Sequence, residues 1–287
     1  MHSSIHGMTG VAGAALLTLT AIASANVVET RDLDEVIPVT AGQPLVVIVK
    51  NITGPVRVTE HDQNRVEMHA TETIRGDLQA DIERARRELT LRTESEPGRV
   101  AFRVRRANDD GGDDCSCGPW GDDYVVEYDI EVRVPRGTML DVATVNDGAV
   151  TAEGISGDFT LANVNGAVHL TGATGSGAIK TVNGNVEASF ARAPTAASSF
   201  HTVNGDLDVT LPNDLSADLE LRTMHGDVLT DFEVESLTQP PTVDRTRNGG
   251  RAVLRMNRAT AFRVGTGGAT HSFNTLNGDI YIRKANR

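Results

Sequence analysis

The chain has 287 residues, a formal charge of −12 at pH 7 and only 4% aromatic residues. An acidic chain repels phosphate backbones and anionic lipid, so we expect no nucleic-acid partner. This length can bury a sizeable core as one elongated unit or as two modest domains.

Residues 1–25 are predicted to be a signal peptide. The apolar and small residues of Val11–Ile22 are followed by the cleavage pattern Ala23-Ser24-Ala25. Such a run is too short to span a bilayer as a mature helix. The segment before it has no Lys or Arg, which departs from the usual pattern. We expect a mature chain that starts at Asn26, has no transmembrane segment and is exported to the periplasm or cell surface.

Residues 26–135 are expected to form a β-rich N-terminal part with one helix. Apolar residues from Leu78 to Leu89 recur at steps of four, three and four, which predicts a helix with Asp77 as its N-cap. NITGPVRV at Asn51–Val58 is interpreted as an early copy of a Thr-Gly corner. Strands are predicted at Leu45–Val49, Val56–Val58, Leu89–Thr93, Arg99–Arg105 and Tyr124–Val134.

The loop at residues 108–123 is the first candidate site, because it carries both cysteines, the only Trp and six carboxylates. Ca²⁺ prefers carboxylate oxygens, but the spacing matches neither an EF-hand nor the nonapeptide calcium repeat. We favour a solvated acidic loop and expect no metal or cofactor. The residues that could contact a partner are Asp113, Asp114, Trp120, Asp122 and Asp123.

Cys115 and Cys117 form a Cys-x-Cys pair in the same loop. Cysteines of an exported protein should oxidise, but two so close in sequence can form a disulfide only if the loop bends tightly. A soft-metal site is the alternative. It would need further ligands, because a tetrahedral site takes four, and no His or Met lies nearby in the sequence.

A six-residue phrase recurs within residues 136–287, as in TVNGNV at Thr181–Val186 and TVNGDL at Thr202–Leu207. A fixed period near twenty residues predicts stacked coils. Asn and Gly tolerate positive φ, so the phrase is interpreted as a corner, and its Asn side chains are expected to form a stacked amide ladder. The turn position is occupied by Asn146, Asn165, Asn183, Asn204 and His225 in steps of 19, 18, 21 and 21, and again by Asn277.

Apolar residues alternate with polar ones on both sides of each corner, which indicates short strands with one buried face. A hairpin meander could also use Asn-Gly turns. It should place a comparable turn at every junction, whereas here the second corner is loosely Ser-Gly or Thr-Gly. We therefore predict an all-β fold, a β-solenoid with coils of about 18–21 residues, interrupted by an excursion loop near residues 235–251.

The run from Tyr128 to Val168 resembles the bacterial DUF4097 family. The family's hallmark is a strand ending in Val-Pro-x-Gly, followed by repeated Asn-Gly-Asp-Val and Ser-Gly-Asp units, and its members are labelled "putative adhesins". The resemblance covers the chain from roughly Val46 onward. It implies an exported, envelope-associated solenoid, and it carries over no catalytic residue.

A second candidate site is the column two residues after each turn Asn, which contains Asn185, Asp206, Asp227 and Asp279. Carboxylates about 5 Å apart suit a retaining glycosidase. Asp after Gly is also an ordinary turn residue, and repetition in every coil is what folding requires. We favour a non-catalytic, adhesin-like scaffold that binds an envelope protein or glycan. A polysaccharide-active enzyme is the alternative.

Overall fold

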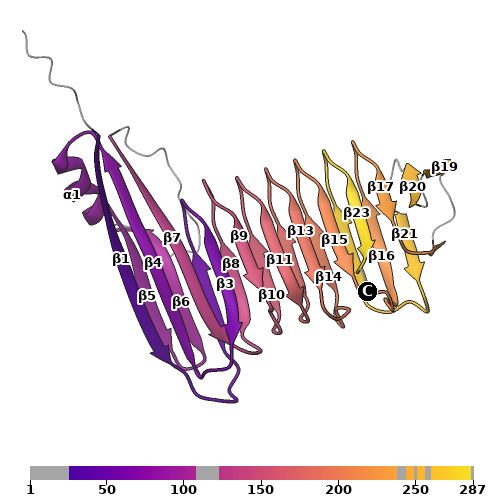
Figure 1. Ribbon diagram of the computed structural model, residues 1–287, viewed down its shortest axis with the longest axis horizontal. Coiled ribbons are helices and arrows are strands. Elements are labelled where there is room, and N and C mark those ends of the chain that lie inside the picture. The colour runs from indigo at the N-terminus through magenta and orange to yellow at the C-terminus, as the bar shows by residue number, and fades with distance from the viewer. Residues whose placement is uncertain (1–25, 108–122, 238–243, 249–250, 256–259, 286–287) are drawn as a thin grey trace, which may run out of the picture.

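The computed structural model describes residues 26–107, 123–237 and 260–285, and the backbone of residues 244–248 and 251–255. Within these residues, 23 strands form two large sheets, A and B, whose inner faces enclose the core, and one short helix lies at the N-terminal end (Figure 1). The fold is the predicted β-solenoid. In the described part of the chain, no helix has the length and apolar character needed to cross a membrane.

Most strands pair in parallel with neighbours from other coils, which excludes the meander. In spatial order sheet A contains β1 (Val27–Pro38), β4 (Arg65–Gly76), β7 (Tyr124–Pro135), β3 (Val56–His61), β9 (Val150–Glu153), β11 (Val168–Ala173), β13 (Val186–Phe190), β15 (Leu207–Leu211), β23 (Ile280–Lys284), β17 (Val228–Thr230), β20 (Arg251–Arg255) and β19 (Asp244–Asn248). Sheet B contains β5 (Leu89–Glu96), β6 (Arg99–Arg106), β2 (Val46–Lys50), β8 (Met139–Ala143), β10 (Phe159–Ala162), β12 (Gly177–Lys180), β14 (Ser198–His201), β22 (Thr270–Asn274), β16 (Ala217–Arg222), β21 (Thr260–Val264) and β18 (Val234–Ser236).

A coil consists of one strand of sheet B, an Asn-Gly corner and one strand of sheet A. The first coil is β2–β3, and it stacks directly on β8–β9 across the expected boundary at residue 136. Its corner aligns Thr53 with Asn146. NITGPVRV is therefore a copy of the Asn-Gly corner, and our assignment to the Thr-Gly corner was wrong.

The coil β22–β23, here called the inserted coil, lies out of sequence order. β22 pairs in parallel with both β14 and β16, and β23 pairs with both β15 and β17. In Figure 1 the yellow β23 lies between β15 and β17. Between β17 and β22 the chain forms β18 to β21, in the region where we expected the excursion loop. These strands pair antiparallel: β21 lies between β16 and β18, and β20 lies between β17 and β19.

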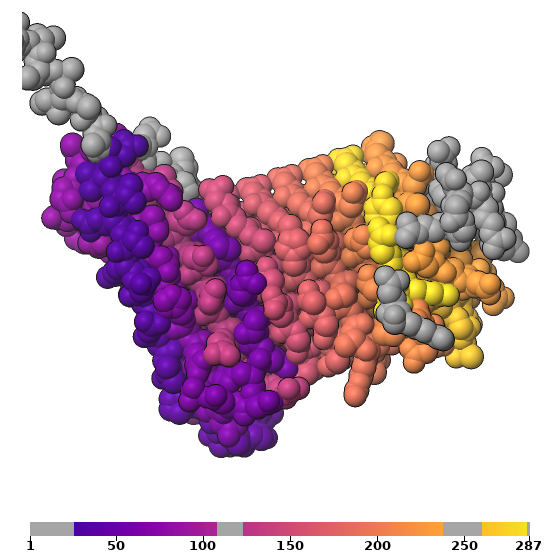
Figure 2. Space-filling model, viewed as in Figure 1, coloured from indigo at the N-terminus to yellow at the C-terminus, as the bar shows by residue number. Residues whose placement is uncertain are grey.

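The N-terminal end is wider than the repeat region, because β1, β4 and β7 are 12-residue antiparallel strands (Figure 2). Helix α1 (Gln79–Glu88) packs against this end through Ile82 and Ala85. Its N-cap is Leu78, so Asp77 was wrong by one residue. The Leu78 N–H donates to the Asp81 carboxylate at 2.9 Å, a bond that the acidic N3 residue supplies.

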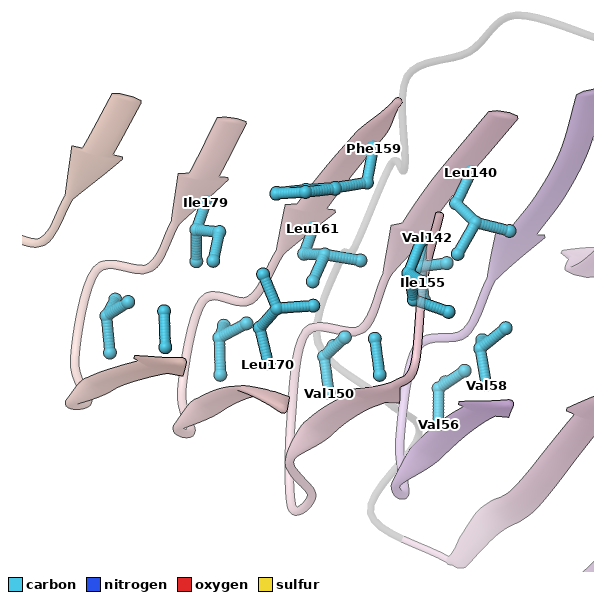
Figure 3. Close-up of a cluster of buried hydrophobic side chains, with 14 of the residues drawn as sticks. Val56, Val58, Leu140, Val142, Val150, Ile155, Phe159, Leu161, Leu170 and Ile179 are labelled. Atoms are coloured by element: carbon cyan, nitrogen blue, oxygen red, sulfur yellow. The ribbon is translucent and has the colours of Figure 1, made fainter. Parts of the chain in front are cut away.

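The core is a double row of branched apolar side chains between the sheets. Figure 3 shows Leu140, Leu161 and Ile179 from sheet B pointing toward Val150 and Leu170 from sheet A. Parallel register places equivalent residues of successive coils side by side. Farther along the stack, the rings of Phe200 and Phe273 stack at 4.9 Å.

Candidate binding surface

The turn asparagines form a hydrogen-bonded column along one corner of the solenoid. Each Asn Nδ2 donates to the Oδ1 of the Asn in the preceding coil, so every inner member is both donor and acceptor. His225 occupies the last position through a backbone bridge to Asn277. The bonds are Asn165 to Asn146 (2.8 Å), Asn183 to Asn165 (2.8 Å), Asn204 to Asn183 (2.8 Å) and Asn277 to Asn204 (2.7 Å).

Glycine follows the turn position because neighbouring coils approach closely there. A Cβ atom on Gly184 would lie 2.2 Å from the carbonyl oxygen of Gly166, and one on Gly205 would lie 2.1 Å from that of Gly184. The φ of Gly184 is outside the left-handed range. Positive φ is therefore not the reason for glycine at Gly184, whereas the equivalent Gly205 and Gly278 do have positive φ values of 153° and 154°. Asp147, the extra residue of the first repeat phrase, has a left-handed conformation with a φ of 53°.

The threonines that begin the phrase are buried, and their hydroxyls donate to these glycine carbonyls. Each hydroxyl satisfies a backbone oxygen that would otherwise be shielded from water. Gly and Thr of neighbouring coils thus form one contact. The bonds are Thr144 to Gly54 (2.8 Å), Thr181 to Gly166 (2.9 Å), Thr202 to Gly184 (2.9 Å), Thr275 to Gly205 (3.0 Å) and Thr223 to Gly278 (3.1 Å).

The carboxylate column follows the same coil order, with Asp279 between Asp206 and Asp227. The Asp279 N–H donates to Asp206 Oδ1 at 2.8 Å, and the Asp227 N–H donates to Asp279 Oδ1 at 2.8 Å. Asn185 supplies the same acceptor to the Asp206 N–H at 3.0 Å. One oxygen of each acceptor therefore holds the next coil in place.

The outward faces of both sheets carry ion pairs, which on sheet B join Lys50 to Asp141 at 2.6 Å and Arg263 to Asp218 at 2.8 Å. On sheet A, Arg57 pairs with Glu153 at 3.1 Å and Arg283 with Asp208 at 2.7 Å. On sheet B, a shallow groove of about 760 Å³ crosses several coils. Its floor consists mainly of small side chains, including Thr160, Ala178, Ser199 and Ser272.

One cluster of unlike charged and aromatic side chains lies at the N-terminal end, and our sequence reasoning missed it. Glu72 is 1% exposed and faces the core from β4. Tyr128 donates its hydroxyl to Glu72 at 2.6 Å, and Arg31 binds both carboxylate oxygens at 2.8 and 3.0 Å. Arg86 of α1 lies 3.7 Å from Glu72 and forms a 2.7 Å ion pair with Glu29.

This cluster, the Glu72 clamp, joins β1, β4, β7 and α1 around a single carboxylate. Burial, and then Glu72 itself, raise the pKa of Tyr128 well above its ordinary value of 10, because both disfavour a phenolate there. Burial followed by the 2.5 Å bond to Glu88 raises the pKa of Tyr124 to about 12. A signal was present in the sequence, since Glu72 interrupts the apolar alternation of Val66, Met68, Ala70 and Ile74.

Most candidate residues of the acidic loop lie outside the described residues, namely Asp113, Asp114, Cys115, Cys117, Trp120 and Asp122. Asp123 is described, and its carboxylate pairs with Arg84 at 2.7 Å, which anchors the loop's end to α1. Within the described ranges, no three His, Cys, Asp or Glu side chains are grouped closely enough to hold a metal ion.

Parallel coils stacked through an amide ladder define a β-solenoid repeat protein. Residues 142–259 match the family model described as Toastrack DUF4097, which confirms the resemblance seen in the sequence. The repeat region is thus similar to the DUF4097 family over these residues. No curated protein matches the chain at the sequence level.

Several solved structures are similar in backbone trace at low identity. A "putative cell adhesion protein" from Clostridium sporogenes is 8% identical, with 90% of this chain and 100% of that chain covered and a TM-score of 0.43. A "putative adhesin" from Bacteroides fragilis is 10% identical, with 91% and 99% covered and a TM-score of 0.33. A "putative lipid binding protein" from Parabacteroides distasonis is 10% identical, with 90% and 97% covered and a TM-score of 0.26.

Proposed function

We propose that this protein is a non-catalytic binding scaffold of the cell envelope, exported through the signal peptide at residues 1–25. The supporting observation is that the repeated polar side chains of the corner are used to bond coil to coil. Catalysis requires unlike groups that converge on an open groove. The unlike groups that do converge, in the Glu72 clamp, are occupied by one another.

A scaffold of this kind would present broad sheet faces to an envelope protein or glycan. Both sheets offer paired charges, and sheet B also offers the shallow groove over small side chains. Hydrogen-bonding side chains at fixed coil spacing suit a partner that is itself extended. The acidic loop at residues 108–123 remains a proposed contact region, through Asp113, Asp114, Trp120, Asp122 and Asp123.

The alternative is a polysaccharide-active enzyme that uses Asp206 and Asp279, which lie in neighbouring coils. Its acid–base pair would have to act while each carboxylate also accepts a backbone N–H from the next coil. That arrangement favours a structural role for the column.

Co-sedimentation with insoluble envelope polysaccharide, together with release of reducing ends, tests the proposal. We expect wild-type protein to bind at least one envelope fraction without releasing reducing ends. Hydrolysis that disappears in Asp206→Asn or Asp279→Asn, with an unchanged melting temperature, would instead establish the enzyme. Intact-mass analysis of the exported protein tests the predicted start at Asn26, and a retained Met1 would contradict export by cleavage.

A further inference from the structure

The inserted coil carries a buried histidine at a position that apolar or small residues occupy in other coils. His271 is 1% exposed, and neither ring nitrogen has a hydrogen-bond partner among the residues that the structure describes. Its register neighbours in the flanking strands are Ser198 and Leu219. Farther along sheet B the equivalent residues are Phe159, Leu140 and Val47.

Among the described residues, no hydrogen-bond or charged partner stabilises a proton on the ring. The flanking strands direct Phe200 and Leu221 inward, and the opposite strands contribute Leu207, Val209 and Ile282. The other titratable side chains of these strands lie at outward positions: His201, Asp208, Asp218, Glu220, Arg222, Tyr281 and Arg283. Lys284 has the parity of Ile280 and Ile282 but is exposed at the end of β23, where its ammonium group lies 5.1 Å from the centre of the Phe232 ring. Burial alone lowers the pKa of His271 below its ordinary value of 6.5.

The corner of the inserted coil makes side-chain hydrogen bonds to a neighbouring coil. Asn277 and Asp279 make the side-chain bonds to Asn204 and Asp206 described above, and Thr275 caps the Gly205 carbonyl. The His271 end, by contrast, has a side chain that can gain a hydrogen-bond partner only outside the core. The flanking coils, β14–β15 and β16–β17, are joined to each other by residues 212–216, so the inserted coil is not part of the chain path between them.

We propose that the inserted coil opens on acidification, because the ring of His271 can take up a proton freely only when β22 leaves the core. The ring is neutral in the closed state, so its opening equilibrium is independent of pH above about 6.5. Below that pH the opened state binds a proton and gains population. The ratio of opened to closed coil should rise about tenfold for each pH unit until the closed-state ring also titrates.

Amide hydrogen exchange can detect this opening, because neighbouring N–H groups of the same corner donate to different coils. The N–H groups of Gly205 and Leu207 donate to Asn277 and Asp279 of the inserted coil at 2.9 Å. The N–H of Asn204 donates instead to Val182, on the other side, at 2.8 Å. Opening should deprotect Gly205 and Leu207 and leave Asn204 protected.

We expect protection factors, corrected for intrinsic exchange, to fall about tenfold between pH 7.5 and 5.5 for residues 270–284, Gly205 and Leu207. Strands β10 to β13 and Asn204 should change less than twofold. His271→Leu, which copies Leu219 of the neighbouring strand, should abolish the pH dependence. His201→Leu removes an exposed histidine from the adjacent strand β14 and should retain it.

His271→Gln provides a second neutral side chain if the leucine variant does not fold. Unchanged protection of residues 270–284 in the wild type over this pH range would overturn the proposal. So would a tenfold fall that persists in His271→Leu or His271→Gln, or one that spreads equally to β10–β13, since that would be global unfolding. These outcomes are independent of whether the protein binds an envelope partner.

Discussion

The repeat corner and the Glu72 clamp solve the same problem, joining neighbouring strands, in opposite ways. The corner uses many equivalent contacts: an Asn bond, a Thr-to-Gly bond and an Asp-to-backbone bond recur from coil to coil. The clamp uses one buried carboxylate that contacts three other elements. The corner is half exposed and redundant, whereas the clamp is buried and unique.

This difference determines how each region should respond to mutation. In a repeat array stability is approximately a sum of intrinsic and nearest-neighbour terms, so one lost contact subtracts one small term. Removing one member of a buried charged cluster also leaves its partners uncompensated. The N-terminal end should therefore be sensitive to single substitutions, and the corner should be sensitive only where backbones touch.

The largest effect is expected for Glu72→Ala, which leaves Arg31 and the Tyr128 hydroxyl without their partner. Because Arg31 is 47% exposed and keeps part of its hydration, we expect a loss of about 3 kcal/mol in the free energy of unfolding. Urea unfolding measures it. Glu153→Ala removes an exposed partner of Arg57 on the same sheet and should cost less than about 1 kcal/mol. Equal losses would show that the clamp is no stronger than a surface pair.

Gly184→Ala tests where the corner is rigid. The new Cβ would lie 2.2 Å from the Gly166 carbonyl, so we expect a loss of about 2 to 3 kcal/mol from overpacking. Gly154→Ala is the matched control, because Gly154 has a φ of 71° and open space around it. It should cost about 1 kcal/mol through backbone strain alone. A larger loss at Gly154 would show that backbone strain at positive φ costs more stability than the close approach between coils.

The fold class was predictable because its determinants are local in the sequence. Alternation identifies the inward positions, and a period near twenty residues identifies the coil. The order of the coils is not local. Every coil presents similar parallel edges, so the spacing from His225 to Asn277 does not reveal that Asn277 precedes His225 in the stack.

The roles of single residues were less predictable, because they depend on contacts between coils. Gly184 looks like a turn glycine in the sequence, and only the 2.2 Å approach to Gly166 shows its actual function. Glu72 was visible as an acid at an inward position of β4. Its partners Arg31 and Tyr128 lie 41 and 56 residues away, and their register follows from tertiary pairing.

Tyr128→Phe separates the hydrogen bond of the clamp from its charge. The hydroxyl donates to a carboxylate, so its loss should cost about 2 kcal/mol at pH 7. The folded-state pKa of Tyr128 is raised above 10, so the stability carried by the neutral phenol is complete below pH 10 and falls as pH rises. Unfolding measured from pH 9 to 11 should show a steeper decline for wild type than for Tyr128→Phe. Parallel curves would contradict the assignment.

Thr202→Val should have a smaller effect, although Thr202 is fully buried. The substitution keeps the shape and removes the hydroxyl that donates to the Gly184 carbonyl at 2.9 Å, so we expect a loss of about 1 kcal/mol. Thr160→Val, on the outward face of β10, controls for the change in residue type and should be close to neutral. Equal melting temperatures for the two variants would mean that the Gly184 carbonyl finds another donor.

Asp206→Asn should change stability least, by less than about 0.5 kcal/mol. Asparagine retains an Oδ1 that can accept the Asp279 N–H, and the preceding coil already carries Asn185, which makes this bond to Asp206 at 3.0 Å. The scaffold proposal therefore predicts an unchanged melting temperature and unchanged binding to envelope polysaccharide. A destabilisation above about 1 kcal/mol would show that the negative charge itself supports the stack, in the way that a charge-assisted bond does. The corner and the clamp would then differ in burial and redundancy, and no longer in their dependence on charge.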